Sequence, residues 1–288
     1  MKTLRYEIVD VFTDRPYAGN PLAVVLDAEE LDGSQMRTIA REFNLSETAF
    51  VLPPSDGADY KVRIFTPTHE LPFAGHPSVG TAVTLARLGR LRAGDMVQEC
   101  GAGMLPVSVA NGAAKLTGGQ PEIGGELDPG PLLAAVGLGV ADHHGAAPRA
   151  AGCGISFFYL PVHQAALERA KPDAAALRVL GQSGISVFSW DPDSGTAHAR
   201  VFCEPVGVLE DPATGSAALG LGVWLVAAGL APGDGETGYA VRQGVEIRRP
   251  SRLDCTVAAE HGVATSATVA GEVTPVAAGE IAVPPFVG

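Results

Sequence analysis

The stretches FAGHPSVGTA at Phe73–Ala82 and LEDPATGSAA at Leu209–Ala218 follow one pattern. Each has a polar residue, a proline, two spacer residues, a glycine, a hydroxyl residue and an alanine, and each then enters an apolar run. The polar residue is His76 in the first copy and Asp211 in the second. A predicted strand precedes each copy, RIFTP in one case and RVFCEP in the other. The repetition indicates a chain built from two similar halves.

Each half also has one helix that is apolar almost all round. The first predicted helix, HPSVGTAVTLARLGRL, ends at Gly89, and the second covers Pro212–Ala228. A helix without a polar face must be enclosed, and the strands around it are the obvious enclosure. The sequence therefore predicts an α+β fold of two pseudo-symmetric domains, each a barrel-like mixed β-sheet wrapped around a central buried α-helix.

The predicted domains are residues 1–118 and residues 122–275. The stretch between the halves, GGQPEIGGELDPGP, is rich in glycine and proline and is predicted to be a linker. The last strand, within residues 277–287, could return to the first domain. An amphipathic helix is expected at SQMRTIAREFN, where Met36 and Ile39 have helical spacing.

Bulk properties exclude several classes of protein. The 288 residues carry a formal net charge of −12, which argues against nucleic-acid and anionic-membrane partners. The longest apolar run, Ala217–Ala231, is too short and too rich in glycine to span a membrane. Charged residues interrupt any signal-peptide core at the N-terminus, so a cytoplasmic protein is expected.

The sequence predicts neither a metal nor a cofactor. The four cysteines are scattered without a C-x-x-C pair, and we expect them to be reduced and buried. The adjacent histidines in Asp142–His144 could suggest a metal, but a solvated loop explains them better. Hydrolase-elbow and nucleotide-loop motifs are absent, which argues against both classes.

The two motifs predict helix starts. Proline is favoured at the first helical position, so His76 and Asp211 are expected at or next to the two N-caps. Asp211 could act as a cap alone, whereas histidine is a poor cap. Helix N-termini present unpaired N–H groups, and Gly75 and Gly215 let a ligand approach them. If the halves face each other, the interdomain cleft would bind a small carboxylate.

Glu47, in NLSETAF, is the candidate acid and base. It alternates in phase with Ala49 and Val51, so it is expected on an apolar strand face. Desolvation there would raise the pKa of its carboxyl toward neutrality, as suits a group that accepts and returns a proton. A glutamate at a strand edge whose carboxylate reaches solvent is the alternative.

Several long stretches resemble the PhzF-like family, named for the phenazine-biosynthesis isomerase. They are AGNPLAVV, NLSETAFV, RIFTPTHELPFAGHPSVGTA, LEDPATGSAA and VRQGVEIRRPSRL, and the resemblance runs over nearly the whole chain. The resemblance implies a diaminopimelate-epimerase-like fold, an active site between two domains, a cofactor-independent isomerase and a homodimer. In the related epimerases cysteines stand at both helix starts, but neither motif of this chain contains one.

The resemblance implies that Glu47 moves a proton between carbons of a small cyclic or unsaturated carboxylic acid, with His76 and Asp211 around the substrate. The predicted catalytic residues are therefore Glu47, His76 and Asp211. The predicted substrate-binding residues are Ser46, Gly75, Gly215 and Ser216. The alternatives are an epimerase or racemase of a small carboxylate, and a non-catalytic protein that binds such a molecule.

Overall fold

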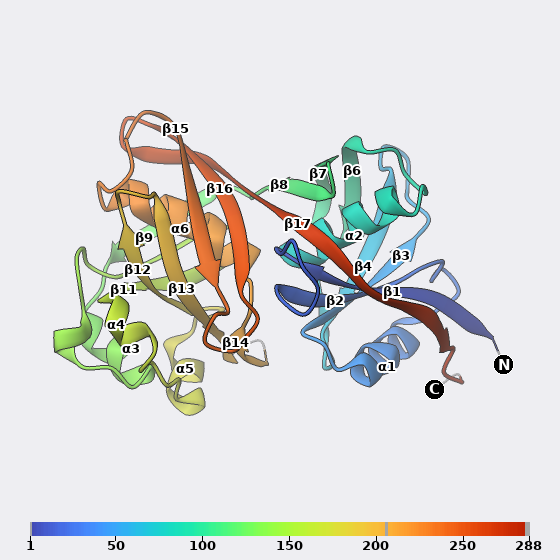
Figure 1. The fold of residues 1–288 in the computed structure, drawn as a ribbon, viewed down its shortest axis with the longest axis horizontal. Helices are drawn as coiled ribbons and strands as arrows, with labels where there is room; N and C mark the ends of the chain where they lie inside the picture. The colour runs from blue at the N-terminus through green and yellow to red at the C-terminus, as the bar shows by residue number, and fades with distance from the viewer. Residues whose placement is uncertain (1, 205–206, 286–288) are drawn as a thin grey trace. The chain divides into compact units, whose positions relative to one another are not determined.

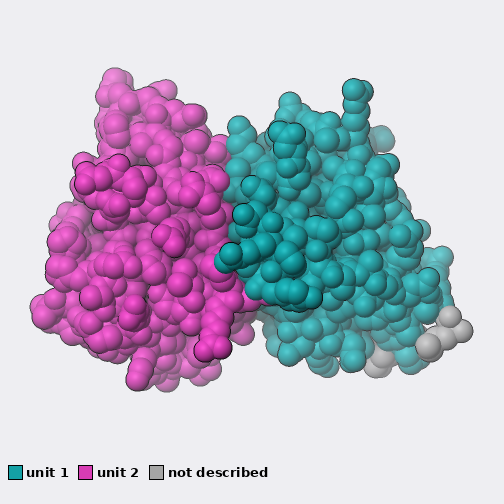
Figure 2. Space-filling view, viewed as in Figure 1, with its two compact units in different colours: residues 1–116, 270–288 teal, residues 117–269 magenta. Residues whose placement is uncertain are grey.

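A computed structural model describes residues 2–204 and 207–285 (Figure 1). The chain has a mixed α+β fold and divides into two compact units, which Figure 2 colours separately. Unit 1 comprises residues 1–116 and 270–288, and unit 2 comprises residues 117–269. Residues 270–275 thus belong to unit 1, although the sequence analysis assigns them to the second domain.

Unit 1 contains a closed ring of strands. Its strands are β1 (Thr3–Val11), β2 (Asn20–Val25), β3 (Glu47–Leu52), β4 (Tyr60–Phe65), β5 (Glu70–Leu71), β6 (Gly94–Cys100), β7 (Gly103–Ala110), β8 (Ala113–Thr117) and the second part of β17 (Val263–Ala282). Among the described residues, eight of these strands pair in the order β17, β1, β2, β3, β4, β6, β7, β8 and back to β17. The short strand β5 pairs only at the end of β4.

The helix α2 (Gly75–Arg87) packs against the ring of unit 1. It contacts β1, β2, β3 and β7, and its first eleven residues are all buried. The smaller helix α1 (Gly33–Phe43) begins with a capping box made by Asp32 and Gln35. Its buried residues include Met36 and Ile39, which confirms the predicted amphipathic helix.

Unit 2 has a comparable set of strands around α6 (Gly215–Ala227). They are β9 (Pro121–Glu126), β10 (Arg149–Cys153), β11 (Ser156–Pro161), β12 (Ile185–Asp191), β13 (Thr196–Cys203), β14 (Val208–Asp211), β15 (Gly235–Gln243), β16 (Ser251–Glu260) and the first part of β17. The pairs β11–β12 and β13–β15 are parallel, as are β2–β3 and β4–β6 in unit 1. The series of strand pairs that begins at β10 in unit 2 and the series that begins at β1 in unit 1 both alternate between antiparallel and parallel, starting with an antiparallel pair.

The two central helices have the same length, but aligning the two copies of the sequence motif does not align the first residues of the helices. The motif aligns residues 135 positions apart, whereas the first residues of the helices, Gly75 and Gly215, are 140 apart. His76 is the second residue of α2, while Asp211 is the last residue of β14 and lies before the helix. The expectation that Asp211 caps α6 is wrong, because Thr214 is the N-cap.

Other predictions also need correction. The predicted linker contains β9 and the start of α3 (Pro129–Ala135), because β9 pairs with β10. The last strand, predicted within residues 277–287, is the end of one long strand, β17, whose residues from Val273 to Ala282 pair with β1. Strand β3 does not alternate, since α2 and α1 both contact it and its four central residues are buried.

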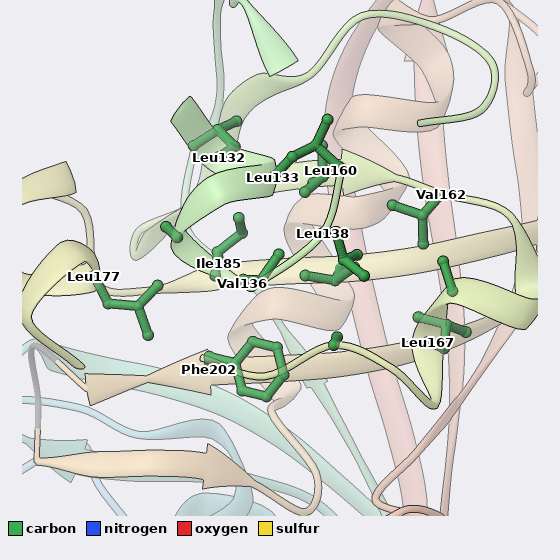
Figure 3. Packing of buried hydrophobic residues seen from close by; sticks show 14 residues of the cluster. Leu132, Leu133, Val136, Leu138, Leu160, Val162, Leu167, Leu177, Ile185 and Phe202 are labelled. Atoms are coloured by element: carbon green, nitrogen blue, oxygen red, sulfur yellow. The ribbon is translucent and has the colours of Figure 1, made fainter. Parts of the chain in front are cut away.

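A second hydrophobic cluster of unit 2 is formed around the small helices α3, α4 (Gln164–Leu167) and α5 (Ala174–Leu180) (Figure 3). Here Leu133 and Leu167 pack with Ile185 of β12 and Phe202 of β13. Phe188, which points to the opposite face of β12, instead packs edge-on against Trp224 of α6, with ring centroids 5.0 Å apart. Strand β12 is therefore covered on both faces. A 3-10 turn at Val140–Asp142 completes the unit.

All four cysteines are buried and none forms a disulfide, which confirms that prediction. Within residues 2–204 and 207–285, no helix is long and apolar enough to cross a membrane.

Close approach between α6 and its sheet predicts a sensitive position at Gly220. A Cβ there would collide with the hydroxyl of Tyr159, which donates a 2.7 Å hydrogen bond to the carbonyl of Ala217. We expect Gly220→Ala to lower the free energy of unfolding by about 1–3 kcal/mol, because overpacking outweighs the gain in helix propensity. Urea unfolding measures this free energy. The control is Gly125→Ala, where a Cβ meets nothing within 4 Å. Equal changes in the free energy of unfolding of both variants would contradict the packing argument.

Candidate functional site

The site in unit 1 is formed where β2, β3 and α2 begin. Glu47 is the first residue of β3, and His76 is the second residue of α2. Their side chains retain 15% and 6% of their exposed area, and His76 Nε2 lies 3.4 Å from Glu47 Oε2. That separation is within ion-pair range but longer than a good hydrogen bond.

Asn20 fixes the other side of the imidazole. It is the first residue of β2, is completely buried, and its Nδ2 lies 3.3 Å from His76 Nδ1. An amide NH₂ group can only donate, so Nδ1 of His76 must accept. The ring proton of a neutral His76 is therefore on Nε2, the nitrogen that faces Glu47.

Burial keeps His76 neutral. Removal of its ring from water lowers the pKa of His76 to about 3. Near neutral pH the imidazole thus carries no charge and presents its Nε2–H toward the carboxylate of Glu47. In this arrangement the Nε2–H of His76 is directed at Glu47, whose carboxylate is the group able to accept a proton.

The start of α2 adds backbone donors beside this pair. Its N-cap, Ala74, has no side chain that could bond the first N–H groups. The amides of Gly75 and His76 belong to this uncapped first turn, where helices bind anions. Ser46, half-buried in the bend before β3, precedes Glu47 directly.

Unit 2 holds Asp211 in a buried hydrogen-bond network. Its Oδ2 accepts a 2.6 Å bond from the hydroxyl of Thr214. Gln243, only 1% exposed, donates from Nε2 to the carbonyl of Asp211 at 2.7 Å and accepts from the amide of Thr214 at 3.2 Å. The segment that enters α6 at Gly215 and Ser216 is therefore fixed by its own chain and by β15.

The structure thus brings Glu47 and His76 together in unit 1 and gathers Asp211, Gly215 and Ser216 in unit 2. Sequence reasoning missed Asn20, Thr214 and Gln243. Asn20 and Gln243 lie within the quoted stretches AGNPLAVV and VRQGVEIRRPSRL, but a buried amide gives no local signal of its partner.

The cysteines have a different environment. None lies in the first turn of α2 or of α6. Burial raises the pKa of the Cys153 thiol to about 12 and also raises the pKa of Cys255. Such thiols stay protonated, whereas a cysteine must be a thiolate to remove a proton from carbon. A pair of catalytic cysteines therefore does not fit this chain.

Comparison with known proteins agrees with these features. A sequence profile for phenazine biosynthesis-like proteins, PhzC-PhzF, matches residues 9–279. The chain belongs to this family. An uncharacterized isomerase of Mesorhizobium japonicum is 38% identical, with 98% of this chain and 99% of the relative covered. The trans-2,3-dihydro-3-hydroxyanthranilate isomerase of Pseudomonas aeruginosa is 36% identical, with 86% and 88% covered.

Solved structures share the fold. A Bacillus anthracis protein of the PhzF family superposes with a TM-score of 0.90 at 28% identity, covering 98% of this chain and all of that one. A hydroxyproline epimerase of Agrobacterium vitis has a TM-score of 0.64 at 14% identity, with 98% and 91% covered, and this shows a common fold alone.

The buried imidazole predicts a loss of stability in acid. Histidine titrates near 6.5 in an unfolded chain and the pKa of His76 is lowered to about 3 in the folded one. Between these values the unfolded state binds more protons, so stability falls as the pH drops from about 6.5 toward 3. We expect His76→Gln, which cannot take up this proton, to lose less of its free energy of unfolding between pH 7 and pH 5 than wild type does.

Urea unfolding at the two pH values measures this difference. The matched control is His144→Gln, which removes an exposed histidine and keeps the buried imidazole of His76. If His76→Gln and wild type lost equal stability, His76 would not be held neutral by burial.

Proposed function

We propose that this protein is an isomerase that moves a proton between two carbons of a small cyclic or unsaturated carboxylic acid. The observation that carries the proposal is the contact of Glu47 with a neutral His76 beside the uncapped start of α2. The family relation supports the reaction class, since curated relatives are named isomerases. The chain is accordingly an enzyme of the isomerase class.

Glu47 is the proposed acid and base. Its carboxylate takes a proton from one carbon of the substrate, so that a C–H bond breaks and a carboxylic acid forms. The electron pair shifts along the unsaturated system, and the acid returns the proton to a second carbon. Oxidation state does not change in this sequence, so no electron acceptor is required.

His76 is proposed to orient Glu47 and the substrate. As a neutral donor it can hold the carboxylate or a negative charge that develops on the substrate, and it does not compete for the proton. The amides of Gly75 and His76 and the hydroxyl of Ser46 are the proposed donors to the substrate in unit 1.

The residues of unit 2 are proposed to act on the same substrate. Asp211 is the second polar catalytic group, and the first turn of α6, with Gly215 and Ser216, supplies further N–H donors. The equal lengths of α2 and α6 and the shared order of strand pairs support two pseudo-symmetric halves that each contribute one helix start.

The substrate class is proposed from the named relatives. Trans-2,3-dihydro-3-hydroxyanthranilate is the first compound to assay, because relatives of P. aeruginosa, P. chlororaphis and P. fluorescens are named for its isomerisation. We further propose a cytoplasmic homodimer. The four buried cysteines form no disulfide, which is consistent with a reducing compartment.

An epimerase of a small carboxylate is the second candidate, and a solved Pseudomonas aeruginosa structure described as a predicted epimerase, 35% identical to this chain, favours it. An epimerase returns the proton to the same carbon from the opposite face, whereas the proposed isomerase returns it to another carbon. The position of deuterium in the product therefore distinguishes the two reactions. A binding protein without turnover would incorporate none.

Replacement of the proposed base tests the mechanism. Glu47→Gln keeps the shape of the side chain but cannot accept a proton, so the rate should fall by about 10²–10⁴-fold or more. Binding of the substrate should survive, since the helix amides remain. The measurement is deuterium incorporation from D₂O into substrate and product, followed by NMR and mass spectrometry.

Glu42→Gln is the matched control, because Glu42 is an exposed residue of α1. It should exchange as fast as wild type. Unchanged exchange in Glu47→Gln would assign the base to another residue, with Asp211 as the next candidate.

A further inference from the structure

Unit 2 has a groove that the proposed reaction does not use. Its volume is about 690 Å³, which lies within the range of small-molecule sites in proteins. The lining residues are His144, Val162, His163, Gln164, Ser189, Trp190, Asp191, Ser194, Thr196, His198, Arg242 and Arg252. Asp211, Gly215 and Ser216 are not among them.

The floor of the groove is a row of side chains across four strands. Ser189 of β12 pairs with His198 of β13, His198 pairs with Arg242 of β15, and Arg242 pairs with Arg252 of β16. Residues directly opposite on neighbouring strands share one face of the sheet. Pairing alone therefore places four polar groups, including two guanidinium groups, side by side.

Hydrogen bonds hold one wall in place. Gln164 donates from Nε2 to His198 Nδ1 at 2.7 Å and accepts from the hydroxyl of Ser189. The other ring nitrogen of His198, Nε2, lies 3.0 Å from Glu246 Oε1. Both nitrogens of this ring thus have partners. The rings of His144 and His163, which also line the groove, lie with centroids 4.3 Å apart and are tilted by 34°.

The two arginines are the unexplained part of this site. Like charges directly opposite each other destabilise a sheet. Arg252 is partly compensated by Asp254, with 3.0 Å from Nε to Oδ1. In the part of the chain that the structure describes, Arg242 has no carboxylate within ion-pair distance. An anion between the two guanidinium groups would remove the repulsion and accept their free N–H groups.

Asp254 beside Arg252 and Glu246 beside His198 both lie outside the lining. The lining itself has two arginines and one carboxylate, Asp191, in a chain whose net charge is −12. That carboxylate is engaged locally, since it accepts 2.6 Å and 3.1 Å bonds from the hydroxyl of Ser194 and the amide of Asp193. The three histidines do not form a metal centre, because the described residues contain no metal-binding cluster of His, Cys, Asp and Glu.

We propose that this groove binds a small phosphomonoester, with the phosphate between Arg242 and Arg252. A guanidinium fork matches the geometry of phosphate oxygens. The groove is larger than a phosphate ion, so its remaining volume, beside Trp190 and the stacked histidines, takes the organic part of the ligand. The site is separate from the proposed acid and base, and its test does not depend on turnover.

The test is an NMR titration of the full-length protein. The chain has two tryptophans, Trp190 in the groove and Trp224 in the core, so each gives one indole N–H signal. Glycerol phosphate, inorganic phosphate and glycerol are added separately at constant ionic strength set with NaCl. We expect glycerol phosphate to shift the Trp190 signal in a saturable manner, inorganic phosphate to do so more weakly, and glycerol to have no effect.

Variants identify the binding groups. Arg242→Gln and Arg252→Gln should each raise the dissociation constant at least tenfold, while Arg248→Gln, an exposed arginine outside the groove, should not change it. An unchanged Trp224 signal shows in each case that the core is intact. A linear shift, the same shift with NaCl alone, tighter binding of inorganic phosphate than of the ester, or an equal loss in Arg248→Gln would each overturn the proposal.

Discussion

The contact of His76 with Asn20 on one side and Glu47 on the other decides what unit 1 can do. Strands β2 and β3 are parallel, so both begin at the same edge of the sheet, and their first residues are Asn20 and Glu47. The first turn of α2 brings His76 to that edge. Burial removes the charge of the imidazole, and the amide of Asn20 places its proton. The result is a neutral donor that faces a carboxylate.

In unit 2, different side chains hold the segment before the central helix in place. Its helix start is fixed by Gln243, which bonds both Asp211 and Thr214. Arg200 adds a bidentate pair to Glu210, with distances of 2.8 Å and 2.7 Å, immediately before Asp211. Buried polar groups are stable only when they are satisfied, so these networks leave the loop little freedom. In both units an acidic residue thus contacts the uncapped start of the central helix, Glu47 at His76 and Asp211 at Thr214.

The sequence was sufficient where the decisive information is local. Apolar runs predicted α2 and α6, and the motif around His76 indicated a helix start. The register between the halves could not be found this way, because Pro77 lies inside α2 whereas Pro212 precedes α6. The motif of a proline followed by a glycine therefore begins inside the first turn of α2 but three residues before α6.

Long-range pairing explains the other misses. Strand β9 looked like a linker because glycine and proline dominate it, and only its pairing with β10 makes it a strand. The roles of Asn20 and Gln243 depend on partners 56 and 32 residues away. Arg242 and Arg252 become neighbours through β15 and β16. None of these distances is visible in composition or periodicity.

The central claim, that His76 is a neutral donor directed at Glu47, is tested most directly by ¹⁵N NMR of the His76 ring between pH 4 and pH 9. The account predicts that Nε2 carries the proton and Nδ1 does not over this whole range, and that Asn20→Ala removes the preference for this tautomer. A His76 that titrates near 6.5, or whose proton is on Nδ1, would contradict it.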